Sequence, residues 1–129
     1  MKNIDPVKFT AMSEISMGSP YNAGKVRVDG FDHPCLDQGG FQDRYVYDQS
    51  KQRLILVRWD KGYNIPGFHL LMLDLKKQRI YRSPVMFGCC RLIAMEEGGV
   101  NMEIFDRGNV LNKNFKLAMI NQAITHDPC

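Results

Sequence analysis

The chain has 129 residues, of which 44% are apolar and 24% are charged, and its formal net charge is +3. These values are ordinary for a globular protein, and they exclude the disordered, collagen-like and coiled-coil classes. A chain of this length buries roughly two-thirds of its unfolded surface around one core, so we expect a single domain over residues 1–129.

The start of the chain has no apolar run like the core of a signal peptide, and no later segment approaches the roughly 18 apolar residues of a membrane span. The four cysteines include the adjacent pair Cys89 and Cys90, which cannot bridge to each other without strain. Without a secretory signal, reduced thiols are the expected state. We therefore expect a cytoplasmic protein that does not bind a membrane, although an export route without a signal peptide stays open.

The first forty residues predict an irregular cover. Asp5 as a cap and Pro6 at the first helical position favour a short helix over residues 5–9. Ser, Gly, Pro and Asn residues between Ser13 and Gly24 break any longer element. Residues 25–29 alternate as one brief strand, and residues 30–40 have the glycines, proline and aspartates of a loop.

From Phe41 onward the sequence predicts strands. Six segments are rich in Val, Ile, Leu, Tyr, Phe and Trp, and turn-forming residues bound each of them. The connections are short, so neighbouring strands are expected to pair antiparallel. The six predicted strands cover residues 44–47, 53–59, 67–75, 79–83, 89–95 and 100–105.

One motif occurs twice: Asp-x-x-Lys-Gln-Arg followed by Leu or Ile, beginning at Asp48 and again at Asp74. In both copies the Asp ends a predicted strand, where its side chain can accept backbone hydrogen bonds and start a turn. The motif therefore predicts two hairpin turns. A third turn follows Glu96, where Gly98 and Gly99 can supply positive φ angles.

The two central predicted strands carry apolar residues on both faces, so each face needs a cover. One expected cover is a helix over residues 112–125, which has an apolar stripe at helical spacing. The other is the sheet curling on itself, the N-terminal region or another chain. We thus predict an α+β, mainly β fold: an antiparallel six- to seven-stranded meander with a C-terminal helix packed on it. The stripe comprises Phe115, Ala118, Met119, Ile120, Ala123 and Ile124.

Candidate chemistry is sparse. His33 lies near Cys35 and His126 near Cys129, which are residue types that zinc prefers, but paired Cys-x-x-Cys spacing is missing. The sequence lacks the nucleophile elbow, zinc-protease, phosphate-loop and dinucleotide motifs. We therefore predict neither a metal site, a cofactor nor an enzyme, and we interpret His69 as a core histidine. An enzyme would require a hollow where a histidine meets a carboxylate or a thiol.

The basic residues gather in the middle of the chain, where residues 43–82 carry nine basic and four acidic side chains. Such a patch suits an acidic partner or a phosphate backbone, and it equally suits a sheet edge guarded by charge. Tyr, Trp and Arg are enriched at the centres of protein interfaces. The predicted partner-binding residues are Tyr45, Tyr47, Arg58, Trp59, Tyr63 and Arg82. The alternative is a small nucleic-acid-binding β module, in which the same aromatic rings stack on bases.

The meander formed by residues 43–60, 67–84 and 89–106 resembles the immunity proteins that neutralise bacterial polymorphic toxins, of the contact-dependent or type VI secretion type. The resemblance implies a cytoplasmic inhibitor that covers the active site of one cognate toxin by protein–protein contact and performs no reaction.

Overall fold

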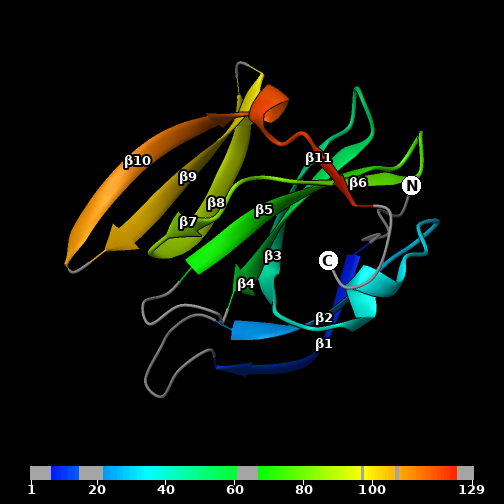
Figure 1. Cartoon of the computed structure of the whole chain (residues 1–129), viewed down its shortest axis with the longest axis horizontal. Coiled ribbons are helices and arrows are strands. Elements are labelled where there is room, and N and C mark those ends of the chain that lie inside the picture. The colour runs from blue at the N-terminus through cyan, green and yellow to red at the C-terminus, as the bar shows by residue number, and fades with distance from the viewer. Residues whose placement is uncertain (1–6, 15–21, 61–66, 97, 107, 125–129) are drawn as a thin grey trace, which may run out of the picture.

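The computed structural model describes residues 7–14, 22–60, 67–96, 98–106 and 108–124, which form two antiparallel β-sheets (Figure 1). The main sheet has the strand order β1-β2-β3-β4-β5-β6-β11, and the short β7 also pairs with β5. The second sheet has the order β10-β9-β8. The strands of the main sheet are β1 (Val7–Glu14), β2 (Asn22–Val28), β3 (Phe41–Asp48), β4 (Arg53–Asp60), β5 (Gly67–Asp74), β6 (Arg79–Arg82), β7 (Met86–Phe87) and β11 (Gln122–Ile124).

The second sheet consists of β8 (Cys89–Glu96), β9 (Gly99–Asp106) and β10 (Asn109–Lys116). Two side chains of β3 join it to the main sheet: Gln42 Nε2 donates to the Cys90 carbonyl at 2.9 Å, and Arg44 Nε donates to the Leu92 carbonyl at 2.7 Å. The contact between the sheets is therefore fixed at one side by polar side chains as well as by apolar packing.

All six strands predicted from Phe41 onward are confirmed, with antiparallel pairing, and so is the brief strand at residues 25–29. The helix expected over residues 5–9 is wrong for residues 7–9, which begin β1; Asp5 and Pro6 lie outside the described residues. Val7 pairs with Val28 and Phe9 with Val26, so the alternating side chains of this segment fit a hairpin that buries one face.

The expected C-terminal helix is also wrong. Residues 112–124 form the end of β10, a single 3₁₀ turn η2 (Leu117–Met119) and β11. β10 pairs with β9 along its whole length, which satisfies backbone groups that a helix would have paired locally. Leu117 and Ile120 are buried, whereas Ala118, Met119 and Ala123 of the expected stripe are exposed. Among the described residues the helical segments are 3₁₀ only, namely η2 and η1 (Pro34–Asp37), so the fold is mainly β.

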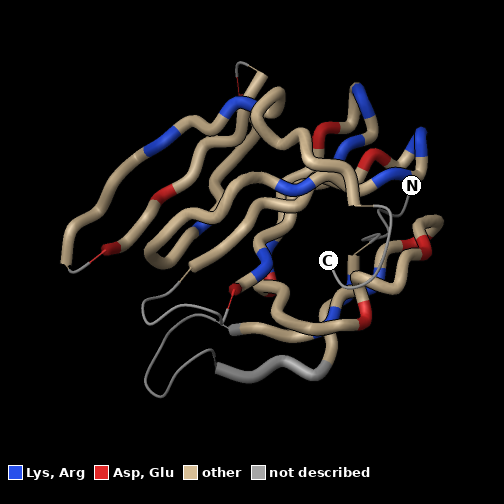
Figure 2. Tube along the Cα trace, viewed as in Figure 1, with Lys and Arg blue, Asp and Glu red and all other residues tan. Residues whose placement is uncertain are grey.

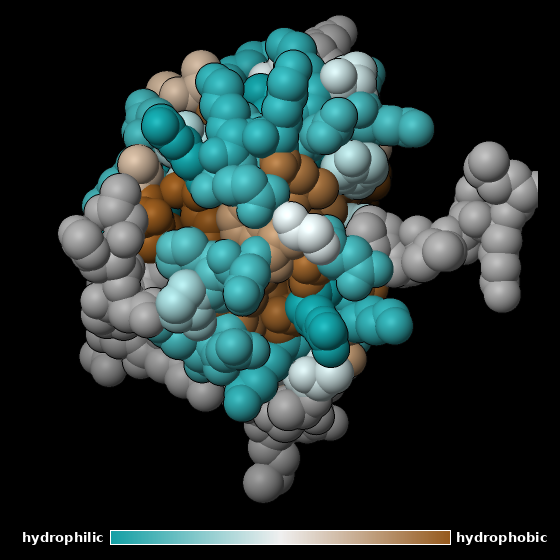
Figure 3. All heavy atoms as spheres, turned by 90° about the vertical axis from the view of Figure 1, so that its right-hand side faces the viewer, coloured by the Kyte–Doolittle hydropathy of each residue, from teal (hydrophilic) through white to brown (hydrophobic). Residues whose placement is uncertain are grey.

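The two faces of β4 and β5 have different covers. On the outer face, Ile55, Val57 and Leu70 pack against the second sheet and η2. On the inner face, defined by Leu54, Leu56, Leu71 and Leu73, the cover is the N-terminal hairpin β1–β2 with η1 and Phe31, which is one of the three covers that the sequence left open. Seen from the right-hand side of Figure 1, apolar residues lie at the centre of this end of the molecule inside a hydrophilic rim (Figure 3).

The recurring motif makes the same turn twice, as the sequence predicts. Asp48 pairs with Arg53 and Asp74 with Arg79, and four residues connect the strands in each case. The fourth is a glutamine in the left-handed region, Gln52 with φ 52° and Gln78 with φ 57°. The Asp74 carboxylate accepts a hydrogen bond from the Lys77 amide at 2.9 Å, as expected of an Asp that starts a turn.

The third turn matches the prediction in part. Gly98 has the expected positive φ of 72°, but Gly99 has no positive φ and is the first residue of β9. A methyl group on Gly99 would lie 2.7 Å from the Phe115 carbonyl oxygen and would also overlap the Asn114 side chain. Gly99 is therefore required by close packing of β10, and not by backbone conformation.

The two motif turns are tied to each other. The Leu75 amide donates to the Gln52 carbonyl at 2.9 Å. The Gln78 amide group donates to the Leu75 carbonyl at 2.7 Å and to the Gly30 carbonyl at 3.1 Å. The β5–β6 turn is thus connected both to the β3–β4 turn and to the N-terminal cover.

We expect Gln52→Gly to stabilise the protein and Gln78→Gly not to. A left-handed conformation costs a non-glycine residue about 1–2 kcal/mol, which a glycine at that position avoids. The greater entropy that glycine loses on folding cancels about 0.5–1 kcal/mol of this gain. Gln78→Gly also removes two side-chain hydrogen bonds, each contributing about 0.5–1.5 kcal/mol. Urea unfolding of both variants measures the difference, and equal changes in the free energy of unfolding would contradict it.

Candidate binding site

The sheet register places the predicted contact residues on two faces. Arg58 and Arg82 lie on the inner face, because they alternate with outer-face residues and pair with His69 and Leu71. Tyr45 and Tyr47 pair with Leu56 and Leu54 and share this face. Trp59 points to the outer face, where its ring meets that of Phe68 edge-on at 6.1 Å. Tyr63 lies outside the described residues.

The two tyrosines lie apart from the arginines. Tyr45 is half-buried, and its ring centroid lies 6.5 Å from that of Phe9 on β1. Tyr47 is 38% exposed near the β3–β4 turn. Tyr45 is therefore part of the packing beneath the N-terminal cover, whereas Tyr47 is available at the surface.

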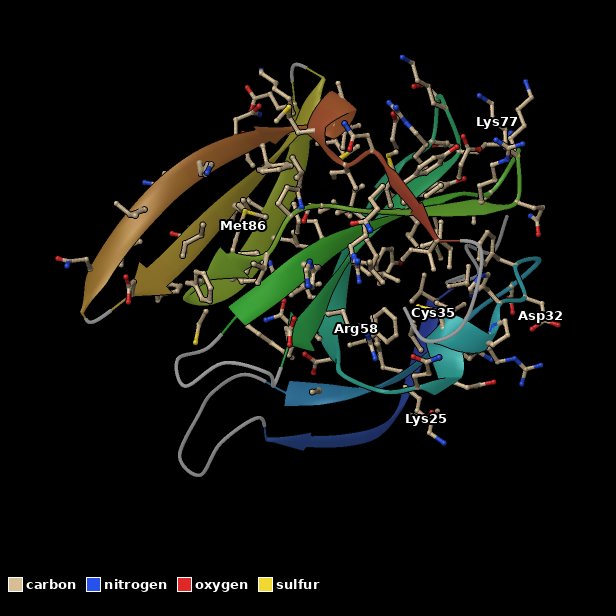
Figure 4. The ribbon with its side chains drawn as sticks, viewed as in Figure 1. Lys25, Asp32, Cys35, Arg58, Lys77 and Met86 are labelled. Carbon is tan, nitrogen blue, oxygen red and sulfur yellow. The ribbon has the colours of Figure 1, made fainter. Side chains whose placement is uncertain are left out.

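A hollow of about 340 Å³ lies at the end of the inner face. Neighbouring strands β4, β5 and β6 provide its charged side chains, and the segment after η1 provides its opposite wall. Figure 4 shows Arg58 on the side of the main sheet that faces β2 and Cys35. The hollow is lined by Gln38, Gly39, Gly40, Arg58, Trp59, Asp60, His69 and Arg82. Three of the six predicted contact residues, Arg58, Trp59 and Arg82, thus line one hollow.

The segment after η1 holds the Arg58 side chain in place. Gly39 and Gly40 have φ angles of 81° and 86°, a conformation that favours glycine, and they turn the chain toward β4. The Gly39 carbonyl accepts a hydrogen bond from Arg58 Nε at 3.1 Å, and the Gly40 carbonyl accepts one from the Trp59 amide at 2.7 Å. The Arg58 guanidinium also lies 5.8 Å from the centre of the Phe41 ring.

His69 connects two strands of the hollow. Its Nδ1 lies 2.9 Å from the Ser83 carbonyl oxygen, and its Nε2 lies 3.2 Å from Asp60 Oδ2. Both partners are oxygen atoms, and they hold the ring between β4 and the residue that follows β6. A histidine thus meets a carboxylate in a hollow, but both of its nitrogens are engaged. This arrangement suits a positioning role better than proton transfer to a ligand.

The charges in the hollow are unequal. Among the described residues that line the hollow, Arg58 and Arg82 face one carboxylate, that of Asp60. Burial lowers the pKa of the Arg58 guanidinium; the Asp60 carboxylate opposes this effect, and the positive charge of Arg82 adds to it. Both arginines line the same hollow, so a single ligand there would meet the charge of both.

Arg82 is the least satisfied member of the group. Its Nε is buried and has no hydrogen-bond partner in the described part of the chain. The side chain lies opposite Leu71 on one side and beside Gln122 of β11 on the other. Together with Arg58, the Arg82 side chain gives the hollow positive charge that suits an anionic group.

The sequence identified the arginines but missed their neighbours. The sequence did contain a signal for Asp60, because Arg58 and Asp60 alternate along one strand and so share a face. His69 can be placed on the same face once the β4–β5 register is known. Gln38, Gly39 and Gly40 were interpreted only as a loop. Their position against Arg58 depends on a contact between distant parts of the chain.

A larger hollow of about 720 Å³ lies between β2, η1 and the β5–β6 turn. Its basic residues Lys25 and Arg27 face three aspartates, Asp29, Asp32 and Asp37, so its charges roughly cancel. It also contains His33, but His33 Nδ1 accepts the Cys35 amide hydrogen bond at 3.0 Å and caps η1. This hollow therefore has a smaller excess of one charge than the hollow at Arg82, and it selects a charged ligand less strongly.

Among the described residues, no group of three or more His, Cys, Asp or Glu side chains is arranged to hold a metal ion. His126 and Cys129 lie outside the described residues.

The cysteines differ in state. Cys35 is disulfide-bonded, so the expectation of reduced thiols is wrong for this residue, whereas Cys89 and Cys90 are free. Burial, followed by the charge on neighbouring Cys89, raises the pKa of Cys90 to about 12. Burial and then the carboxylate of Asp106 raise the pKa of Cys89. Both free thiols are therefore poor nucleophiles near neutral pH, because the reactive thiolate is disfavoured.

A second group of charges lies at the tips of the two motif turns. Lys51, Lys76, Lys77 and Arg79 are exposed there, and Figure 2 shows Lys and Arg positions on two adjacent hairpin ends. At the base of the β3–β4 turn, Asp48 forms an ion pair with Arg53 at 3.0 Å.

Comparisons of the sequence with family models and with curated proteins, and of the fold with solved structures, found no match. In the described segments, no helix has the length and apolar character that crossing a bilayer requires.

We expect Ser83→Ala to destabilise the protein and loosen the hollow. Ser83 is fully buried, and its hydroxyl accepts the Leu70 amide hydrogen bond and donates to the Pro84 carbonyl, both at 2.9 Å. An unpaired buried donor costs about 1–3 kcal/mol. Urea unfolding gives the loss. Ser50→Ala is the control, since the Ser50 hydroxyl bonds Asp48 at the surface, and an equally small loss in both variants would contradict the prediction.

Proposed function

We propose that this protein acts by binding one protein partner, as an immunity protein that neutralises a bacterial toxin by direct contact. The observation that carries the proposal is the meeting of Arg58 and Arg82 in one hollow, although they lie on β4 and β6 with β5 between them. Arginine is enriched among the residues that dominate binding energy at protein interfaces.

Exposed aromatic side chains and the charge of the hollow support this proposal. Tyr47 and Phe87 are among the large side chains that remain exposed, and they supply amphipathic or apolar surface for an interface. The excess of positive charge suits a partner that presents an acidic side chain. A binding protein needs no reaction, which agrees with the engaged His69 and the protonated free thiols.

A cytoplasmic location belongs to the same proposal. The disulfide at Cys35 bears on it, because disulfides persist mainly in oxidising compartments. The intact mass of the protein taken from the cytoplasm, measured with and without reductant, shows whether Cys35 is oxidised there. A reduced Cys35 supports the cytoplasmic location, and an oxidised one supports an oxidising compartment.

The test begins with the neighbouring gene. We expect a large secreted protein with a toxic C-terminal domain to be encoded immediately upstream. The present protein should protect cells that express this domain, and calorimetry should show one-to-one binding. Arg58→Gln and Arg82→Gln should each weaken binding at least tenfold, which corresponds to about 1.4 kcal/mol.

Arg79→Gln is the control, because Arg79 lies on the same strand as Arg82 but is exposed at the turn. Its affinity should stay within about twofold of the wild type, as expected of a peripheral charge. If neither Arg58→Gln nor Arg82→Gln changes toxin binding, the interface lies elsewhere. The absence of a neighbouring toxin, together with failure to protect, would end the proposal.

A second candidate function is nucleic-acid binding at the turn tips. The observation that favours it is the cluster of exposed Lys51, Lys76, Lys77 and Arg79 on two turns joined by the Leu75–Gln52 hydrogen bond. Binding of this kind weakens steeply with salt, in proportion to the phosphates neutralised.

Fluorescence anisotropy with single-stranded RNA and duplex DNA across a salt series separates the two candidates. If the tips bind nucleic acid, Lys51→Gln and Lys77→Gln should each lower the salt slope by about one, while Arg82→Gln should leave it unchanged. A flat salt response, or no binding at low salt, would exclude this function.

A further inference from the structure

We propose that the hollow around Arg82 is a carboxylate-binding site that receives an Asp or Glu side chain of the partner. The source of the carboxylate rests on the proposed function, but the site itself rests on the described side chains of β4, β5 and β6.

The first step is the unsatisfied donor. A buried donor without a partner costs about 1–3 kcal/mol, and more when it is charged. Folded proteins leave few such groups, and each requires an explanation. Arg82 Nε is buried without a partner in the described chain, and its strand is held by Ser83, whose amide donates to the Leu70 carbonyl at 2.9 Å. Arg82 also lines the hollow, so an anionic ligand bound there would compensate the positive charge of this side chain.

The second step is that the two arginines have different roles. Arg58 Nε is bound to the Gly39 carbonyl, and Arg58 Nη2 lies 3.5 Å from Gln38 Oε1, so this side chain is anchored by the wall. Arg58 therefore contributes mainly charge and a fixed surface. Arg82 lines the hollow and contributes a guanidinium, whose planar fork matches the two oxygens of a carboxylate.

The third step is the choice of anion. Asp60 lines the same hollow and holds His69, so any anion here meets one fixed negative charge. A carboxylate carries a single charge, whereas phosphate approaches two at neutral pH and is repelled more strongly. These features favour a monocarboxylate over phosphate.

The test uses the isolated full chain. Two-dimensional ¹H–¹⁵N spectra of the arginine Nε–H groups are recorded while sodium propionate replaces sodium chloride at constant ionic strength. The Arg82 signal should shift in a saturable manner, with a Kd of about millimolar order, as expected for one charge-assisted contact. Sodium phosphate at equal concentration should produce a smaller fraction of the shift.

Two variants make the result specific. Arg82→Lys keeps the charge but loses the fork, and the response of the Arg58 signal to propionate should then require at least tenfold more ligand. Arg79→Lys should behave as the wild type. Retained one-dimensional spectra of both variants show that they fold.

Two results would overturn the assignment: no saturable shift of Arg82 with propionate, or an unchanged Kd in Arg82→Lys. Tighter binding of phosphate would overturn the choice of carboxylate. These outcomes do not depend on whether the proposed immunity function is correct. A negative titration with intact toxin binding removes the carboxylate site alone, whereas a positive titration without toxin binding removes the immunity function alone.

Discussion

Burial of both faces of β4 and β5 is the constraint on which the rest of the structure depends. Leu54 and Leu56 point to the inner face, Ile55 and Val57 point to the outer face, and all four are fully buried. A strand that is apolar on both sides cannot leave either side in water without losing the free energy of burial. The N-terminal hairpin covers the inner face, and the second sheet covers the outer face.

The same strands become polar at one end, and this change creates the candidate site. Along the inner face of β4, Leu54 and Leu56 are followed by Arg58 and Asp60, and the register places His69 beside them. Because alternation and pairing are fixed by the core, the polar row is as rigidly placed as the apolar one. Charged side chains thus stand at the boundary of the core, where water is partly excluded and electrostatic contacts are strengthened.

The local part of this fold was predictable from the sequence, and the long-range part was not. The six strands and the motif turns follow from apolar runs bounded by turn-formers, and both depend only on neighbouring residues. The end of β10, η2 and β11 were mistaken for one helix because their apolar residues recur at helical spacing, whereas the place of β10 is decided by pairing with β9. β11 returns to pair with β6, a contact that no local pattern contains. For the site, Arg58 and Arg82 were selected by residue type, but their meeting and the roles of His69 and Asp60 required the register.

Several positions in this chain are fixed by the shape of the backbone and not by apolar character. Gly39 and Gly40 turn the chain against Arg58, Gly99 leaves room for β10, and Gln52 and Gln78 occupy left-handed positions. Core residues can be exchanged for others of similar volume over evolution, whereas these positions accept few alternatives. A distant homologue is therefore best recognised by the spacing of its glycines and paired turns, even when its apolar residues have diverged beyond detection.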